Sequence, residues 1–142
     1  ITQTKEGIKL KDRPQRGEVW YYKPSYKKGS DKGHIQSGAR PVVIVSNNLC
    51  NDNSSVLLAV PCTTKPKKNL PTHTLFTIDS EFNIALCEQA GPILLKDLVN
   101  KKYVLDDYIV DQIDEALSVA FGLKPVYSKE EKVEMCNGTC KS

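Results

Sequence analysis

This sequence of 142 residues lacks any long apolar run. A helix that crosses a bilayer needs about 20 consecutive apolar residues, and no stretch approaches that length. The first residues, ITQTKEGIKLKDRPQRG, are polar and charged, so the apolar core of an export signal is lacking as well. We therefore expect a cytoplasmic protein that does not act at a membrane.

Metal-binding side chains are also scarce. The chain has two histidines, and no cluster of histidine, cysteine and carboxylate residues has the spacing of a metal site. The five cysteines form an odd set; Cys62 and Cys87 lie in apolar runs and are predicted to be small buried residues, which suits a reducing compartment. Cys136 and Cys140 offer too few ligands for a metal ion. We therefore expect no metal and no other cofactor.

The charge of the chain is unevenly distributed, although its net value is only +3. Residues 1–75 carry 13 Lys or Arg against 5 Asp or Glu, whereas residues 76–142 carry 7 against 12. A basic half is typical of nucleic-acid-binding proteins, but basic termini can also serve solubility alone. Charge by itself does not decide between the two.

The pattern of apolar residues predicts one mainly β domain, antiparallel and closed by a C-terminal helix. Five strands are predicted from β-branched, aromatic or continuous apolar content: Glu18–Lys23, Val42–Val45, Val56–Val60, His73–Ile78 and Ile84–Gln89. We expect a turn at Asn47–Ser55 and a short helical turn within Leu94–Val99.

A helix is predicted over Asp106–Phe121. Apolar residues recur there at three- and four-residue spacing: Ile109, Ile113, Leu117 and Ala120 or Phe121. Asp106 and Asp107 suit the positive end of the helix dipole, and Gly122 suits the stop.

The most informative stretch is Gly29–Ser46, with the sequence GSDKGHIQSGARPVVIVS. Its glycines permit backbone angles that other residues avoid, and Pro41 can enter a strand at its edge. Arg40 is thereby placed at the mouth of a strand, next to a basic loop. Guanidinium donors match phosphate oxygens in pairs, so the stretch suits phosphate binding. A basic turn before a strand is, however, often only a solvated connection.

Five blocks together resemble the MazF/PemK/Kid family of toxin endoribonucleases. They follow the family's order: RGEVWYY, GHIQSGARPVVIVSNN, VLLAVPCTTKPKKNLPTH, IALCEQ and LDDYIVDQIDEAL. The resemblance covers residues 16–123 and leaves a flexible N-terminal arm, 1–15, and a polar tail, 124–142. It implies an SH3-like barrel, usually a homodimer, that cleaves single-stranded RNA sequence-selectively and without metal, using the 2′-hydroxyl as nucleophile. It also implies a partner antitoxin that blocks the RNA groove.

The resemblance assigns catalytic roles to Arg40 and Thr63. Arg40 matches the family's active-site arginine and would clamp the scissile phosphate, whereas an ion pair at the sheet edge is the structural alternative. Thr63 matches the family's strand-end threonine and would donate its hydroxyl to the same phosphate. An ordinary turn threonine is the alternative, and Thr64 could take its place.

One departure concerns the general base. Many relatives have a glutamate before the loop glutamine, whereas Ile35 precedes Gln36 here. Isoleucine cannot accept a proton, so His34 becomes the candidate base, with a plain surface histidine as the alternative.

Further RNA contacts are expected from polar, basic and aromatic residues near these loops: Tyr26, Lys32, Gln36, Thr64, Lys65, Lys67 and Lys68. Relatives often carry a basic residue soon after their Glu-Gln pair, and none follows Gln89 here. Either this RNA contact is missing, or Lys65, Lys67 and Lys68 supply it. Glu88 and His73 are expected to be structural, as is Gln89, and Trp20 is expected in the core.

Two other functions stay open. The same barrel serves a related toxin that poisons DNA gyrase by binding it, which the Arg40 and Thr63 blocks argue against. A non-cleaving RNA-binding module is the other, because Ile35 replaces the expected glutamate.

Overall fold

The computed structural model describes residues 13–25 and 38–125 of the chain. Within these ranges no helix is both long and apolar enough to cross a membrane. The described elements are, in chain order, β1 (Glu18–Tyr22), β2 (Arg40–Ile44), α1 (Asn48–Asn53), β3 (Val56–Thr63), β4 (His73–Ile78), β5 (Glu81–Leu86), the 3-10 helix η3 (Cys87–Gln89), β6 (Gly91–Leu94), the 3-10 helix η4 (Leu95–Asp97), β7 (Leu98–Val104) and α2 (Asp107–Ala120).

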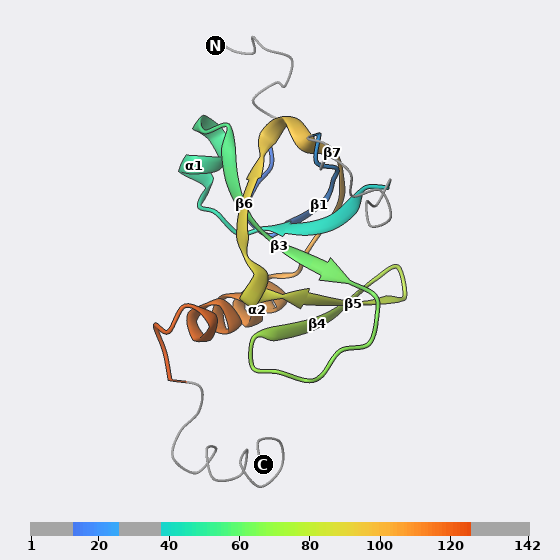
Figure 1. The fold of residues 1–142 in the computed structure, drawn as a ribbon, viewed down its shortest axis with the longest axis vertical. Coiled ribbons are helices and arrows are strands. Elements are labelled where there is room, and N and C mark those ends of the chain that lie inside the picture. The colour runs from blue at the N-terminus through green and yellow to red at the C-terminus, as the bar shows by residue number, and fades with distance from the viewer. Residues whose placement is uncertain (1–12, 26–37, 126–142) are drawn as a thin grey trace, which may run out of the picture.

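All strand pairs are antiparallel, and the strand order is β4-β5-β3-β2-β1-β7. The long strand β3 changes partner along its length: Val56–Ala59 pair with β6, whereas Cys62 and Thr63 pair with β5. Because β3 serves both parts, the sheet curls into a half-barrel, with α2 packed beside β4 and η3 (Figure 1). The predicted antiparallel β-fold with a C-terminal helix is confirmed.

The short helix α1 replaces the turn that was expected at Asn47–Ser55, so this prediction is wrong. Asn47 caps the helix, because its Oδ1 accepts a hydrogen bond from the Cys50 backbone N–H at 2.8 Å. The predicted strand Ile84–Gln89 is wrong in its second half, since Cys87–Gln89 form η3.

Strands β6 and β7 were not predicted at all. Most of their side chains are exposed or half-buried, so neither strand shows the alternation that marks one buried face. The expected helical turn within Leu94–Val99 is confirmed as η4.

The hairpin between β4 and β5 explains why the second strand starts earlier than predicted. Asp79 and Ser80 have φ values of 52° and 70°. Two consecutive positive φ angles are those of a type I′ turn, which joins the strands with only two residues.

The main core lies between the sheet and α2. Its buried residues include Phe76, Ile78 and Ala85 from the hairpin and Ile109, Ile113, Ala116 and Leu117 from α2. Ala120 or Phe121 was predicted to continue this face. Ala120 is half-buried, whereas Phe121 is 64% exposed, because α2 ends at Ala120 and Gly122 turns the chain with a φ of 75°.

A second, smaller cluster is formed by residues of β2, β3 and β6: Val42, Ile44, Leu57, Ala59 and Ile93, with Trp20 packed against it. Cys62 and Cys87 belong to the main core, which confirms that they are buried. Burial is the main reason why the pKa of Cys87 rises to about 12, and burial also raises the pKa of Cys62.

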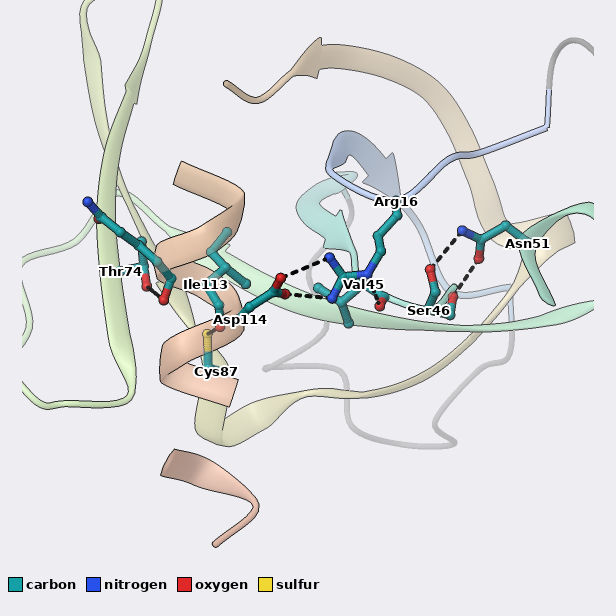
Figure 2. A network of polar contacts seen from close by, with 9 residues as sticks. Arg16, Val45, Ser46, Asn51, Thr74, Cys87, Ile113 and Asp114 are labelled. Carbon is teal, nitrogen blue, oxygen red and sulfur yellow. Dashed lines mark hydrogen bonds and ion pairs between the residues drawn. The ribbon is translucent and has the colours of Figure 1, made fainter. Parts of the chain in front are cut away.

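Arg16 fastens the start of the domain to α2 (Figure 2). Its guanidinium meets the Asp114 carboxylate at 2.6 and 3.3 Å, and its Nε donates to the Val45 carbonyl at 3.0 Å. Just before it, Arg13 donates to the carbonyls of Asn51 and Ser54 at 2.9 and 2.8 Å, so residues next to β1 contact α1 as well.

Candidate functional site

A groove of about 480 Å³ opens where β2, β3, η3 and β6 meet. Its floor is apolar and includes Val42, Ala59, Pro61, Leu86 and Ile93. Polar side chains along its sides are Tyr22, Arg40, Thr63, Lys65, Lys67 and Gln89. An open groove with cationic sides and an apolar floor suits a flexible polyanion whose backbone is charged and whose bases are not.

The register of β2 and β3 explains why Arg40 and Thr63 share this groove. Val42 pairs with Pro61, and both residues contribute to the groove floor. Arg40 lies two residues before Val42 on β2, and Thr63 lies two residues after Pro61 on β3. Side chains two residues apart on a strand point to the same face, so Arg40 and Thr63 both line the groove beside this floor.

Arg40 is the first residue of β2 and lies opposite Tyr22 of β1. The buried residues Val43 and Ile44 anchor the strand, while the Arg40 side chain is exposed. Among the residues that the structure describes, none forms a hydrogen bond or ion pair with its guanidinium. An ion pair at the sheet edge is therefore not seen in this part of the chain, and Arg40 lines the groove.

Thr63 is the last residue of β3, opposite Ile84 of β5. Its Oγ1 accepts a hydrogen bond from the backbone N–H of Lys65 at 3.1 Å, so the local turn contact considered as an alternative does exist. In that contact the hydroxyl is the acceptor. Its own proton therefore stays available for an anion in the groove.

The predicted lysines divide into two groups. Lys65 and Lys67 line the groove, whereas Lys68 and Thr64 do not. Lys68 instead offers its carbonyl oxygen to the ring of His73 at 2.8 Å. His34, Gln36, Tyr26 and Lys32 lie outside the described residues.

Gln89 is a groove residue that the sequence analysis assigned to structure. Glu88, its neighbour in η3, points elsewhere: it accepts hydrogen bonds from Thr72 at 2.9 Å and contacts His73 at 3.1 Å. A 3-10 helix has three residues per turn, so consecutive side chains leave it in different directions. Knowledge of that helix, rather than of a strand, is the signal that separates the two residues.

The pKa of Glu88 is lowered by this arrangement. Partial burial opposes its ionisation, but the hydrogen bond from its own backbone N–H and those from His73 and Thr72 favour the carboxylate more strongly. Neither His73 nor Glu88 lines the groove, and the two contact each other instead.

Within residues 13–25 and 38–125, no group of three or more histidine, cysteine or carboxylate side chains could hold a metal ion. The described side chains of the groove offer hydrogen-bond donors and positive charge. Such a set is suited to hold a phosphodiester and to stabilise extra negative charge on it.

Comparison with known proteins points to one family of toxins. A family model described as "PemK-like, MazF-like toxin of type II toxin-antitoxin system" matches residues 15–121. Endoribonuclease EndoA of Bacillus subtilis (strain 168) is 32% identical over 116 residues, which cover 77% of this chain and 95% of that protein.

Solved structures agree with this match at the level of the fold. An endoribonuclease in complex with its cognate antitoxin, from a mycobacterial species, has a TM-score of 0.64 at 23% identity, covering 78% of this chain and 97% of that one. MazF from Deinococcus radiodurans has a TM-score of 0.61 at 17% identity, with coverage of 78% and 97%. The MazF-like barrel expected from the sequence is confirmed.

Proposed function

Since this chain belongs to the family of PemK-like, MazF-like toxins of type II toxin–antitoxin systems, we propose that it is an endoribonuclease that cleaves single-stranded RNA in the groove described above. One observation carries the assignment of the site: Arg40 and Thr63 line one open groove, beside Lys65 and Lys67. The 32% identity to an endoribonuclease supports the reaction type.

In the proposed reaction the 2′-oxygen of a ribose attacks the adjacent phosphorus, and the bond to the 5′-oxygen breaks. The products are a 2′,3′-cyclic phosphate and a 5′-hydroxyl. Negative charge grows on the non-bridging oxygens between these events. Arg40 donates two parallel hydrogen bonds to them, and the Thr63 hydroxyl donates a third, so both stabilise the transition state more than the substrate.

The attack also needs a base that takes the 2′-hydroxyl proton. We assign this role to His34, because Ile35 occupies the place of the usual glutamate and imidazole accepts protons near neutral pH. The assignment depends on the sequence alone, since residue 34 lies outside the described ranges.

Binding of the RNA chain is assigned to the basic sides of the groove. Lys65 and Lys67 would hold phosphates that flank the cleaved one, and Gln89 would contact a base edge or a ribose. Tyr26, Lys32, Gln36, Thr64 and Lys68 stay predictions of the sequence as further contacts.

The reaction requires no metal ion in this scheme. Attack by the 2′-hydroxyl needs a base and positive charge at the phosphate, which His34 and Arg40 are proposed to supply, and the departing 5′-oxygen takes a proton from water. Cleavage should therefore persist in excess EDTA.

A cognate antitoxin is proposed as the natural inhibitor. A structural relative was solved with its cognate antitoxin, and an open cationic groove is a natural target for an acidic protein segment. We further propose a homodimer in the cytoplasm, where messenger RNA is available, with residues 16–123 as the toxin domain between an N-terminal arm, 1–15, and a C-terminal tail, 124–142.

Incubation of purified protein with mixed-sequence single-stranded RNA in EDTA tests the proposal. We expect cuts at a limited set of sequences, with 5′-hydroxyl ends, and their loss in Arg40→Ala. A matched Arg40→Lys variant keeps the charge but loses the paired donors, so it should cut more slowly than the wild type. RNA left whole under all conditions would contradict the assignment.

Two results would favour other functions. RNA that is bound but never cut would indicate a binding module, as the replacement by Ile35 allows. Inhibition of DNA supercoiling by gyrase, without RNA cleavage, would indicate a gyrase poison.

A further inference from the structure

The loop that carries the two groove lysines has no regular structure of its own. It runs from residue 64 to 72, between β3 and β4, and both Lys65 and Lys67 lie on it. Lysine side chains are long and flexible, so they act on a phosphate efficiently only where the backbone beneath them is fixed.

We propose that His73 and Glu88 form a positioning pair that fixes this loop and so aims Lys65 and Lys67 at the RNA. The inference depends on the proposed function, because it concerns how the same groove holds its substrate. Neither residue is placed against the reacting phosphate. Both act through the loop.

The contacts of His73 reach the loop on one side and η3 on the other. Its Nδ1 lies 2.8 Å from the Lys68 carbonyl oxygen, and its Nε2 lies 3.1 Å from Glu88 Oε2. Its backbone N–H donates to the Leu70 carbonyl at 2.9 Å. The His73 side chain is only 4% exposed, whereas that of its partner Glu88 is 37% exposed, so water reaches the carboxylate more readily than the imidazole.

Glu88 completes the connection. Its other oxygen, Oε1, accepts a hydrogen bond from the Thr72 hydroxyl at 2.9 Å. The backbone N–H of the preceding residue, Cys87, donates to the Thr72 carbonyl at 2.9 Å. Thr72, the last residue of the loop, is thus held to η3 by two hydrogen bonds, and His73, the next residue, adds its contact with Glu88 Oε2.

The pair also links two sides of the groove. Gln89 follows Glu88 directly in η3 and lines the same groove as Lys65 and Lys67 of the loop 64–72. A contact that holds the loop to η3 therefore fixes Lys65 and Lys67 relative to Gln89. Neither core cluster includes His73 or Glu88, so their loss should disturb the groove before it disturbs the fold.

The test measures RNA affinity at several salt concentrations. Single-stranded RNA with 2′-fluoro riboses serves as probe, because it has no 2′-hydroxyl and cannot be cut. Each phosphate contact contributes about 0.7 to the slope of log affinity against log salt. If neither lysine contacts a phosphate any longer, His73→Ala should lower that slope by about 1.4, and the double variant Lys65→Ala/Lys67→Ala should lower it by the same amount.

A double-mutant cycle separates positioning from general damage. Adding His73→Ala to the double lysine variant should have no further effect on affinity, because the lysines through which His73 acts are already gone. With cleavable RNA, His73→Ala should raise KM and leave kcat within about twofold. Glu88→Gln, which keeps the shape of the pair, should show the same pattern more weakly.

Thr74→Val is the matched control. Thr74 is the next residue of β4, and its hydroxyl donates to the Gln112 carbonyl of α2 at 3.4 Å, away from the lysine loop. This variant should melt earlier without a change in the salt slope. A wild-type slope in folded His73→Ala and in Glu88→Gln, or effects that simply add to those of the lysines, would overturn the inference. Wild-type protein that neither binds nor cuts RNA would instead overturn the proposed function.

Discussion

Replacement of Thr63 by valine tests the chemistry of the groove most directly. Valine has nearly the shape of threonine but no hydroxyl, so Thr63→Val removes one donor to the phosphate. Loss of one such donor typically costs about 10²–10³ in rate, or about 3–4 kcal/mol of transition-state stabilisation. Because the donor acts mainly when charge has built up on the phosphate, we expect kcat to fall by about this factor and KM to change little.

Two features of the structure limit other effects of this change. Thr63 is only half-buried, and the one described hydrogen bond that it accepts comes from the backbone N–H of Lys65, which is exposed. Water can replace that bond, so the free energy of unfolding should fall by about 1 kcal/mol or less. Thermal melting of the variant measures this term independently of activity.

Two further variants make the result specific. Thr63→Ser keeps the hydroxyl and should recover most of the rate. Thr64→Val removes the neighbouring hydroxyl, which does not line the groove, and should leave cleavage unchanged. Single-turnover cleavage of a defined RNA provides the rates. A Thr63→Val enzyme within about tenfold of the wild type, or a larger loss in Thr64→Val, would refute the assignment of the donor to Thr63.

Three predictions concern the frame around the groove. Arg16→Ala should lower the free energy of unfolding, measured by urea denaturation, by about 1–2 kcal/mol. The variant loses a partly exposed ion pair with Asp114 and a hydrogen bond to the Val45 carbonyl. Unchanged stability would show that Arg16 does not hold the start of the domain to α2. The lowered pKa of Glu88 stabilises the fold above the ordinary pKa of glutamate, and this contribution is lost as the pH falls through the lowered value; Glu88→Gln should therefore flatten the acid side of a plot of Tm against pH, and parallel curves would contradict this account. Cys62 and Cys87 should resist thiol reagents in the native protein at about pH 8, because burial raises the pKa of both thiols; rapid labelling of either one, located by mass spectrometry, would show that the core opens.

Much of the frame follows from short-range patterns in the sequence. The run around Val43 and Ile44 is buried as a continuous apolar strand should be, and the spacing of Ile109, Ile113 and Leu117 predicts the buried face of α2. These elements follow from the sequence because one periodic face, buried against a core, is enough to define each of them.

Other elements leave no such signal. The exposed strand β7 has no buried face to produce an alternating pattern, and α1 depends on a single cap at Asn47 rather than on an apolar stripe. Glu88 and Gln89 were predicted together as part of a strand, whereas η3 directs one to the lysine loop and the other to the groove.

The sequence alone thus determined the family, the order of the main strands, the helix and the choice of Arg40 and Thr63, since block order and periodicity are properties of neighbouring residues. Only the tertiary structure decided that these two side chains line one groove, that Lys65 and Lys67 line it as well while Lys68 does not, and that Gln89 belongs to it. The physical reason is that strand register and the path of a loop are set by contacts between residues far apart in the chain, and no local pattern encodes them.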